Sequence, residues 1–223
     1  MKKLIFIFLA FATMQWSFAQ NPIIKNVGNF TSLSASNAVP ITLVASPDKT
    51  VEISGNGAEL VEVKNNNGNL MLRLSNDCHS CDVKVIVNYT ILNNIQTSSA
   101  ASVKGTGIIK ASNLSLNASS AGSITLNIEA QKLSVDASSA GMINLSGTVD
   151  YQKADVSSAA QFSAKDLHSK QTDVTVSGAA KAIVYATETV NANVSSAGNV
   201  DVYGNPNTKN NTSREYVPGH IKW

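Results

Sequence analysis

A short tag of small residues recurs in the second half of the chain and constrains the fold more than any other feature. The centres of its copies are Ser99, Ser120, Ser139, Ser158, Gly178 and Ser196. The interval between one centre and the next varies little from copy to copy. Self-similarity at a period of about 20 residues is typical of a solenoid, in which each repeat forms one coil that stacks on the next.

Positions at a fixed distance from each centre form columns of similar residues. The column four residues before the centre is apolar: Ile95, Leu116, Val135, Ala154, Val174 and Ala192. The column three residues before it is polar: Gln96, Asn117, Asp136, Asp155, Thr175 and Asn193. Alternation with period 2 indicates strands, not helices. The sequence therefore predicts an all-β, single-domain parallel β-helix with about 19–20 residues per coil.

The tag itself predicts a sharp corner with its alanine inside the bend. The position after this alanine is Ala as often as Gly, so we expect a corner that needs no left-handed backbone. Residues 30–91 alternate less regularly, and we interpret them as opening coils of the same solenoid, with a cap. Residues 206–223 are rich in Asn, Pro and Gly, which predicts a poorly ordered polar tail.

The N-terminal segment, residues 1–19, has the layout of a secretory signal peptide. Lys2 and Lys3 precede an apolar run from Leu4 to Ala12, and Ser17-Phe18-Ala19 forms a cleavage site. Cleavage would leave a β-helical domain over residues 20–205, with no transmembrane segment. It would also remove two of the 17 Lys+Arg and leave 15 basic against 15 acidic residues. This balance argues against a nucleic-acid partner, which needs clustered positive charge.

The end of the repeat region carries a family resemblance. Corners of the form Ser-Ser-Ala followed by Gly or Ala, about 20 residues apart, lead to Val200-Asp201-Val202-Tyr203-Gly204-Asn205-Pro206. The family's usual corner is richer in Gly than the corners of this chain. This arrangement resembles the bacterial head GIN domain family, labelled auto-transporter adhesins and common in Bacteroidetes-type bacteria. The resemblance covers Phe30 to Pro206. It implies a parallel β-helical fold and export, and it implies no enzymatic activity.

Cys78 and Cys81 are the only cysteines and form a C-x-x-C motif. A zinc site needs four ligands. With only three histidines in the chain, we predict no metal site. A redox pair would open a helix, whereas strands flank this motif. Outside the cytosol we expect a local disulfide that closes a turn between residues 70–74 and 83–87.

Two further pairs of residues are weak site candidates. Asp136 and Asp155 share an outward column on adjacent coils, and such stacked carboxylates could recruit a cation. Tyr185 and Tyr203 fall seven positions after their corners, so they could form a glycan-stacking patch or a structural ladder. His168 has no partner by motif and is interpreted as an exposed loop residue. We predict no cofactor and no catalytic residue.

These observations favour a non-enzymatic, exported β-solenoid that serves in adhesion or in envelope or extracellular interactions, with a glycan or a surface protein as partner. The alternative is a secreted polysaccharide-active β-helix enzyme that uses the stacked carboxylates. A purely structural envelope protein is a third possibility. The sequence leaves open the oligomeric state and the choice among periplasm, cell surface and extracellular space.

Overall fold

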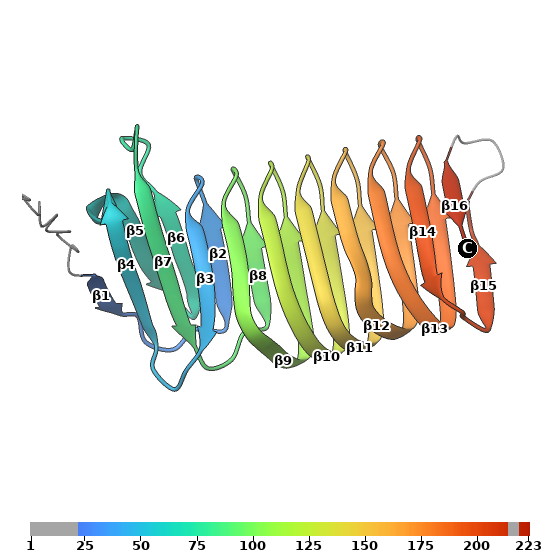
Figure 1. Cartoon of the computed structure of the whole chain (residues 1–223), viewed down its shortest axis with the longest axis horizontal. Coiled ribbons are helices and arrows are strands. Elements are labelled where there is room, and N and C mark those ends of the chain that lie inside the picture. The colour runs from blue at the N-terminus through green and yellow to red at the C-terminus, as the bar shows by residue number, and fades with distance from the viewer. Residues whose placement is uncertain (1–21, 214–218) are drawn as a thin grey trace, which may run out of the picture.

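The computed structural model describes residues 22–213 and 219–223, so the predicted leader, residues 1–19, lies outside the described residues. The chain forms an elongated solenoid of stacked strands (Figure 1). A single short 3-10 helix, η1 (Ala58–Leu60), interrupts the strands of these two ranges. Within the same ranges, no helix is long and apolar enough to cross a membrane. The strands are β1 (Ile23–Asn26), β2 (Ser32–Ser36), β3 (Pro40–Ala45), β4 (Thr50–Asn56), β5 (Val61–Asn66), β6 (Asn69–Leu74), β7 (Asp82–Tyr89), β8 (Asn94–Thr97), β9 (Ser102–Ala118), β10 (Ser123–Ala137), β11 (Met142–Val156), β12 (Gln161–Val176), β13 (Lys181–Val194), β14 (Asn199–Gly204), β15 (Thr208–Asn211) and β16 (His220–Lys222).

The repeat region forms the parallel β-helix that the spacing predicts. Strands β9 to β13 each run from one corner to the next and bend midway, so each strand contributes to both faces of the solenoid (Figure 1). The first part of β9 pairs with β3 and its last part pairs with β8, both in parallel. Strands β10 and β11 pair in parallel from Ser123↔Met142 to Ala137↔Val156. Each coil thus stacks on the next at the usual strand spacing of about 4.8 Å.

The apolar columns fill the interior, as the alternation predicts. Every residue of the column four before the corner centre is buried, from Ile95 at 0% exposure to Val174 at 2%. The column four after the centre is buried as well: Val103, Ile124, Ile143, Phe162, Ala182 and Val200. The polar columns between them point outward. Two faces separated by this narrow apolar layer need few aromatic side chains, which explains the low aromatic content of 6%.

The corners correct two expectations. Ser120 (φ 47°) and Ala121 (φ 60°) are both left-handed, and the equivalent pair is left-handed in every repeat. The turn closes when Gly122 N–H donates to Ser119 O at 2.8 Å. The alanine is exposed at the tip instead of lying inside the bend, and the buried small residue is the one after it. The expected corner without a left-handed backbone is therefore wrong as well. The left-handed residues are the corner centre and the alanine after it, and not the Gly or Ala that follows.

Hydrogen bonds between coils help to explain why Ser and Ala tolerate this backbone. A left-handed conformation costs an L-residue about 1–2 kcal/mol. In return, Ala121 N–H donates to Ser139 O at 3.0 Å, and Ala140 N–H donates to Ser158 O at 3.0 Å. The same bond recurs from corner to corner and includes Ala38, whose N–H donates to Ser99 O at 2.8 Å. The row of corners is therefore a hydrogen-bonded ladder along one edge of the solenoid.

The N-terminal strands belong to the same solenoid, but their order in space differs from their order in the chain. One face runs β1-β4-β7-β3-β9, and the other places β2 between β6 and β8. The chain begins with β1 at the outer end of the stack and crosses to β2 and β3, next to the repeat region (Figure 1). It then returns to the outer end as β4 and β5, and β6 and β7 fill the space between these two layers. Strands β4 and β5 pair antiparallel with β7 and β6. This reversed layer forms the expected cap.

The described residues of the C-terminal segment, 206–213 and 219–223, continue the stack, whereas a poorly ordered tail was expected; residues 214–218 of that prediction lie outside the described residues. Strand β15 pairs in parallel with β13, and β16 pairs in parallel with β14. Val194 N–H donates to Ser213 Oγ at 2.8 Å, which fixes the segment after β15. The two short strands cover much of the edge that the last coil would otherwise expose.

One part of the interior is polar. The core column that holds Leu114 and Leu133 continues with Gln152 and Thr172, both 0% exposed. Gln152 Nε2–H donates to Thr172 Oγ1 at 2.8 Å, and Thr172 Oγ1 lies 2.6 Å from Ser169 Oγ. The carbonyl oxygen Oε1 of Gln152 has no hydrogen-bond partner among the described residues. This column therefore changes from apolar packing to a hydrogen-bonded cluster over two successive coils.

Candidate functional site

An aromatic patch lies on three successive coils near the C-terminal end. Tyr185 in β13 and Tyr203 in β14 stand directly opposite each other in the parallel register. The ring of His168 in β12 meets Tyr185 edge to face at 4.3 Å, and Lys165 Nζ lies 4.9 Å from the centre of the Tyr203 ring. His168 is exposed as expected, but it lies in a strand and not in a loop. The patch therefore places three rings on adjacent coils, with a cation beside Tyr203.

The two aspartates are also adjacent in space. Asp136 in β10 pairs directly with Asp155 in β11, and both side chains are exposed. Lys153 Nζ lies 3.7 Å from Asp155 Oδ2, which partly balances the charge. Within residues 22–213 and 219–223, no group of three or more His, Cys, Asp or Glu side chains is placed to hold a metal ion. The pair provides two carboxylates on an open face and no enclosing ligand set.

A polar ladder crosses the outer face of the last coils. Tyr151 O–H donates to Asp173 Oδ2 at 2.6 Å, and Asn191 Nδ2–H donates to Asp173 Oδ1 at 2.6 Å. Asn210 Nδ2–H extends the ladder to Asn191 Oδ1 at 2.7 Å. The hydrogen bond to Asp173, together with desolvation and the negative charges of Asp173 and Asp155, raises the pKa of Tyr151 to about 12. The bond also fixes the orientation of the Tyr151 ring.

The sequence analysis missed this ladder, although a signal for it exists. Asp173 and Asn191 each lie five residues before a corner centre. Their equal distance from the corner predicts that the two side chains lie on adjacent coils, and the register pairs them directly. The contribution of Tyr151 has no such signal, because its phenol reaches diagonally across two positions of the register.

One surface hollow follows the midpoint of the long strands. We call it the bend groove. Its volume is about 690 Å³, and small side chains in register line it: Ala111, Ala130, Val149 and Ser169. Its charged side chains pair with each other, Lys110 with Glu129 at 2.8 Å and Lys170 with Asp150 at 2.7 Å. The bend groove is therefore polar and close to electrically neutral.

A second hollow lies beside it on the outer face of β9, β10 and β11. We call it the lysine groove. Its volume is about 630 Å³, and its charged lining consists of Lys110, Lys132 and Lys153. Asn113 and Ser115 of β9 stand in register with Lys132 and Ser134 of β10. Tyr151 lines it as well, and Ile91 is a further lining residue, 54% exposed.

The comparison with known families decides the family of this chain. Residues 29–206 match the family described as "Putative auto-transporter adhesin, head GIN domain". The chain belongs to the head GIN domain family.

Solved structures share the fold of this head GIN chain at low sequence identity. A structure named a putative adhesin from Bacteroides fragilis is 21% identical, with a TM-score of 0.82 over 92% of this chain and 97% of that one. A structure named a putative adhesin from Parabacteroides distasonis is 18% identical, with a TM-score of 0.70 over 91% and 95% of the two chains. A structure named a putative lipid binding protein from the same species is 16% identical, with a TM-score of 0.65 over 92% and 97%. None of the curated proteins matches the chain.

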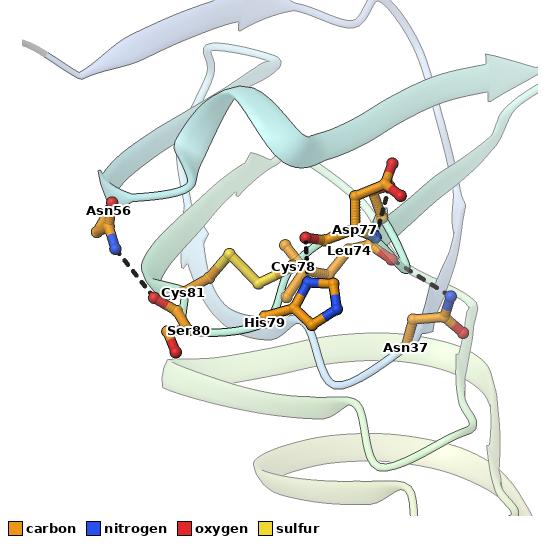
Figure 2. The surroundings of a disulfide bond; sticks show 9 residues. Asn37, Asn56, Leu74, Asp77, Cys78, His79, Ser80 and Cys81 are labelled. Carbon is orange, nitrogen blue, oxygen red and sulfur yellow. Dashed lines mark hydrogen bonds between the residues drawn. A yellow bond between two sulfur atoms is a disulfide. The ribbon is translucent and has the colours of Figure 1, made fainter.

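In this head GIN chain, the disulfide replaces one of the corners. Cys78 and Cys81 are joined within the loop between β6 and β7, with Cα atoms 5.8 Å apart (Figure 2). Every coil of the repeat region has a Ser-Ala or Gly-Ala tip at this position. A Cβ on Gly57 would collide with the sulfur of Cys81, so the neighbouring turn needs glycine there.

Side-chain amides hold the disulfide loop on both sides. Asn37 Nδ2–H donates to Leu74 O at 3.3 Å, and Asn56 Nδ2–H donates to Ser80 O at 2.9 Å (Figure 2). His79 points its Nδ1 at Asp77 O, 2.9 Å away, inside the same loop. Strands flank the motif on both sides. The surroundings are therefore those of a structural loop and not of a helix-borne redox pair.

Proposed function

We propose that this chain is an exported, non-enzymatic adhesion or envelope-interaction module that presents one face of a rigid solenoid to its partner. The observation that carries the proposal is the register. Side chains from successive coils form continuous surface features, namely the aromatic patch over β12 to β14 and the two grooves over β9 to β13. A partner can therefore contact many coils at once, each contact being weak. Membership in a family described as adhesins supports the same role.

Protease shaving of intact cells of the source bacterium tests this proposal. We expect the protein to be degraded while a periplasmic control protein is spared. Full protection, with the protein recovered in the soluble periplasm, would refute surface adhesion. In that case envelope partners become the better candidates.

The aromatic patch is the proposed contact surface for a glycan. Sugars stack on exposed aromatic rings. Tyr203 is 39% exposed and so offers such a ring. Tyr185→Ala with Tyr203→Ala should abolish binding to the neutral oligosaccharides of a glycan array. Met142→Ala is the matched control, because Met142 is also an exposed apolar side chain, 42% exposed. Equal binding by all three proteins would reduce the patch to a structural ladder.

A β-helical polysaccharide-active enzyme is the second candidate, and the adjacency of Asp136 and Asp155 is the observation that favours it. The two roles separate by substitution. Asp136→Asn with Asp155→Asn should abolish polysaccharide turnover in the enzyme and leave binding mostly intact in the adhesion module. Turnover by the unchanged protein that disappears in this variant would reject the non-enzymatic proposal.

A further inference from the structure

The lysine groove carries a local concentration of positive charge. Each of three successive coils contributes one lysine to it, Lys110 from β9, Lys132 from β10 and Lys153 from β11, and its lining contains no carboxylate. Outside the predicted leader, the sequence as a whole is balanced in charge, so this concentration is local. The bend groove beside it contains as many acidic as basic side chains.

Neighbouring carboxylates leave these lysines available to a ligand. Lys110 pairs with Glu129 at 2.8 Å and Lys153 pairs with Asp155 at 3.7 Å, but the four side chains are 50–71% exposed. Exposed ion pairs contribute only about 0–1 kcal/mol, so an incoming anion competes with them easily. Lys132 has no ion pair in the part of the chain that the structure describes.

The remaining lining is suited to hydroxyl groups and to a ring face. Side-chain hydroxyls and amides of neighbouring coils provide donors and acceptors: Asn93, Ser112, Asn113, Ser115 and Ser134. Tyr151 adds an aromatic wall whose orientation is fixed by its hydrogen bond to Asp173. Aromatic rings held in this way can stack against the apolar face of a sugar.

The backbone in the groove is already fully used, which argues against a peptide strand as the ligand. Strand β10 pairs along its length with β9 on one side and with β11 on the other. A peptide that adds to a sheet needs an unpaired edge. The ligand must therefore be recognised by side chains, through charge, hydroxyl groups and ring stacking.

The geometry points to the lysine groove as a binding site for an acidic polysaccharide, with carboxylate or sulfate groups on Lys110, Lys132 and Lys153 and a sugar ring against Tyr151. This inference rests on the proposed interaction role. It adds the class of ligand, and the site is distinct from the aromatic patch. A hollow of about 630 Å³ holds a short stretch of a chain. The diagonal of lysines across three coils matches a linear polyanion better than a single small anion.

Binding of the mature full-length protein to immobilised polygalacturonate, heparin and dextran tests the inference. We expect binding to at least one acidic polysaccharide, weakened as NaCl rises from about 50 to about 500 mM, because salt screens exposed charges. We expect no binding to neutral dextran. The heparin arm reports sulfated chains and the polygalacturonate arm carboxylated ones. Failure to bind either of them, or equal binding to dextran, would overturn the inference.

Two sets of lysine substitutions separate the groove from overall charge. The groove variant is Lys110→Gln with Lys132→Gln and Lys153→Gln. Its matched control is Lys64→Gln with Lys84→Gln and Lys104→Gln, which removes the same charge from exposed positions outside the groove. The groove variant should lose about tenfold or more in affinity, since three exposed contacts to the polyanion disappear together. The control should stay within about twofold. Equal losses would overturn the assignment of the site.

A steric variant tests the same site without a change of charge. Ser134 lies exposed in the groove, so Ser134→Trp fills the hollow with little effect on the core. We expect this variant to lose binding while its thermal unfolding stays close to that of the unchanged protein. Retained binding would show that the polysaccharide lies elsewhere. Protease shaving of intact cells does not depend on polysaccharide binding. If the groove binds no polysaccharide, the proposed surface role is therefore still decided by the shaving experiment.

Discussion

Replacing Gln152 by leucine should stabilise the protein. The Gln152 side chain is 0% exposed and its Oε1 has no partner in the part of the chain that the structure describes. An unsatisfied buried polar group costs about 1–3 kcal/mol. The bond from Gln152 Nε2 to Thr172 contributes only about 1 kcal/mol. Leucine removes both and adds apolar burial. The preceding coils already hold Leu114 and Leu133 in this column.

The expected gain for Gln152→Leu is about 1–2 kcal/mol in the free energy of unfolding. Thr172 remains satisfied in this variant, because its hydroxyl can donate to Ser169 Oγ, 2.6 Å away. For a chain of this length the gain corresponds to a rise in Tm of about 2–8 °C. Urea unfolding followed by circular dichroism measures the first quantity, and differential scanning calorimetry measures the second.

Leu133→Gln is the mirror control for this prediction. It places an amide one coil earlier, opposite Gln152 in the register. Leu133 is only 2% exposed. The variant should therefore lose about 2–3 kcal/mol, mainly from lost apolar burial, because the new Nε2–H can donate to Oε1 of Gln152, which lacks a partner among the described residues. A loss of stability in Gln152→Leu would refute the reasoning. It would mean that Oε1 is hydrogen-bonded to a buried water, so that the amide is fully satisfied in the folded protein.

Three further predictions concern the corner, the phenol and the disulfide. Ser139→Val should lower the free energy of unfolding in urea by about 1–3 kcal/mol, because a β-branched residue must then adopt a φ of 49°. Ser138→Val, one position before the left-handed pair, should lower it much less. Tyr151 has a pKa raised to about 12 in the folded state, so its contribution to stability is present below a pH of about 10 and is lost as the pH rises towards 12. Tyr151→Phe should remove this loss of stability. It should also remove the late step in the phenolate absorbance titration. Cys78→Ala with Cys81→Ala should lower stability by no more than about 2 kcal/mol, because the bond closes a very short loop, and the variant should still unfold in one cooperative transition.

Each of these three has a clear contrary outcome. Equal costs for Ser139→Val and Ser138→Val would show that the left-handed backbone at the tip is not the cause. An unchanged alkaline titration in Tyr151→Phe would assign the late step to another tyrosine. Unfolding of the cysteine variant at room temperature would show that the loop, and not the solenoid around it, holds the N-terminal layers together.

Much of the fold could be predicted from the residues, because the same alternating pattern and the same corner recur in every coil of the repeat. The buried columns from Ile95 and Val103 onward follow from alternation with period 2, which places every second side chain inside. The pairing of Asp136 with Asp155 and of Tyr185 with Tyr203 follows from their equal distances to a corner. Parallel stacking preserves these distances near the corners, whereas irregularities midway along β9, β11 and β12 shift the register there.

Other features required contacts between distant residues. The left-handed tips depend on hydrogen bonds from one corner to the next, which the residue types do not reveal. The grooves depend on where the long strands bend, and no residue type marks that position. The interior amide of Gln152 breaks the alternation rule, so alternation predicts an apolar residue where the structure has a polar cluster.

The sequence by itself determined the number of residues in each coil, the side of the sheet that the alternating residues face and the neighbours that side chains near a corner meet on the next coil. These are local properties, and a period of about 20 residues repeats them in every coil. The tertiary structure alone decided the order of the N-terminal layers, where β6 and β7 lie between β2 and β3 on one side and the antiparallel strands β4 and β5 on the other. The physical reason is that an alternating strand fits a parallel or an antiparallel neighbour equally well. Its place in the stack is therefore set by which free edge it meets in the folded chain.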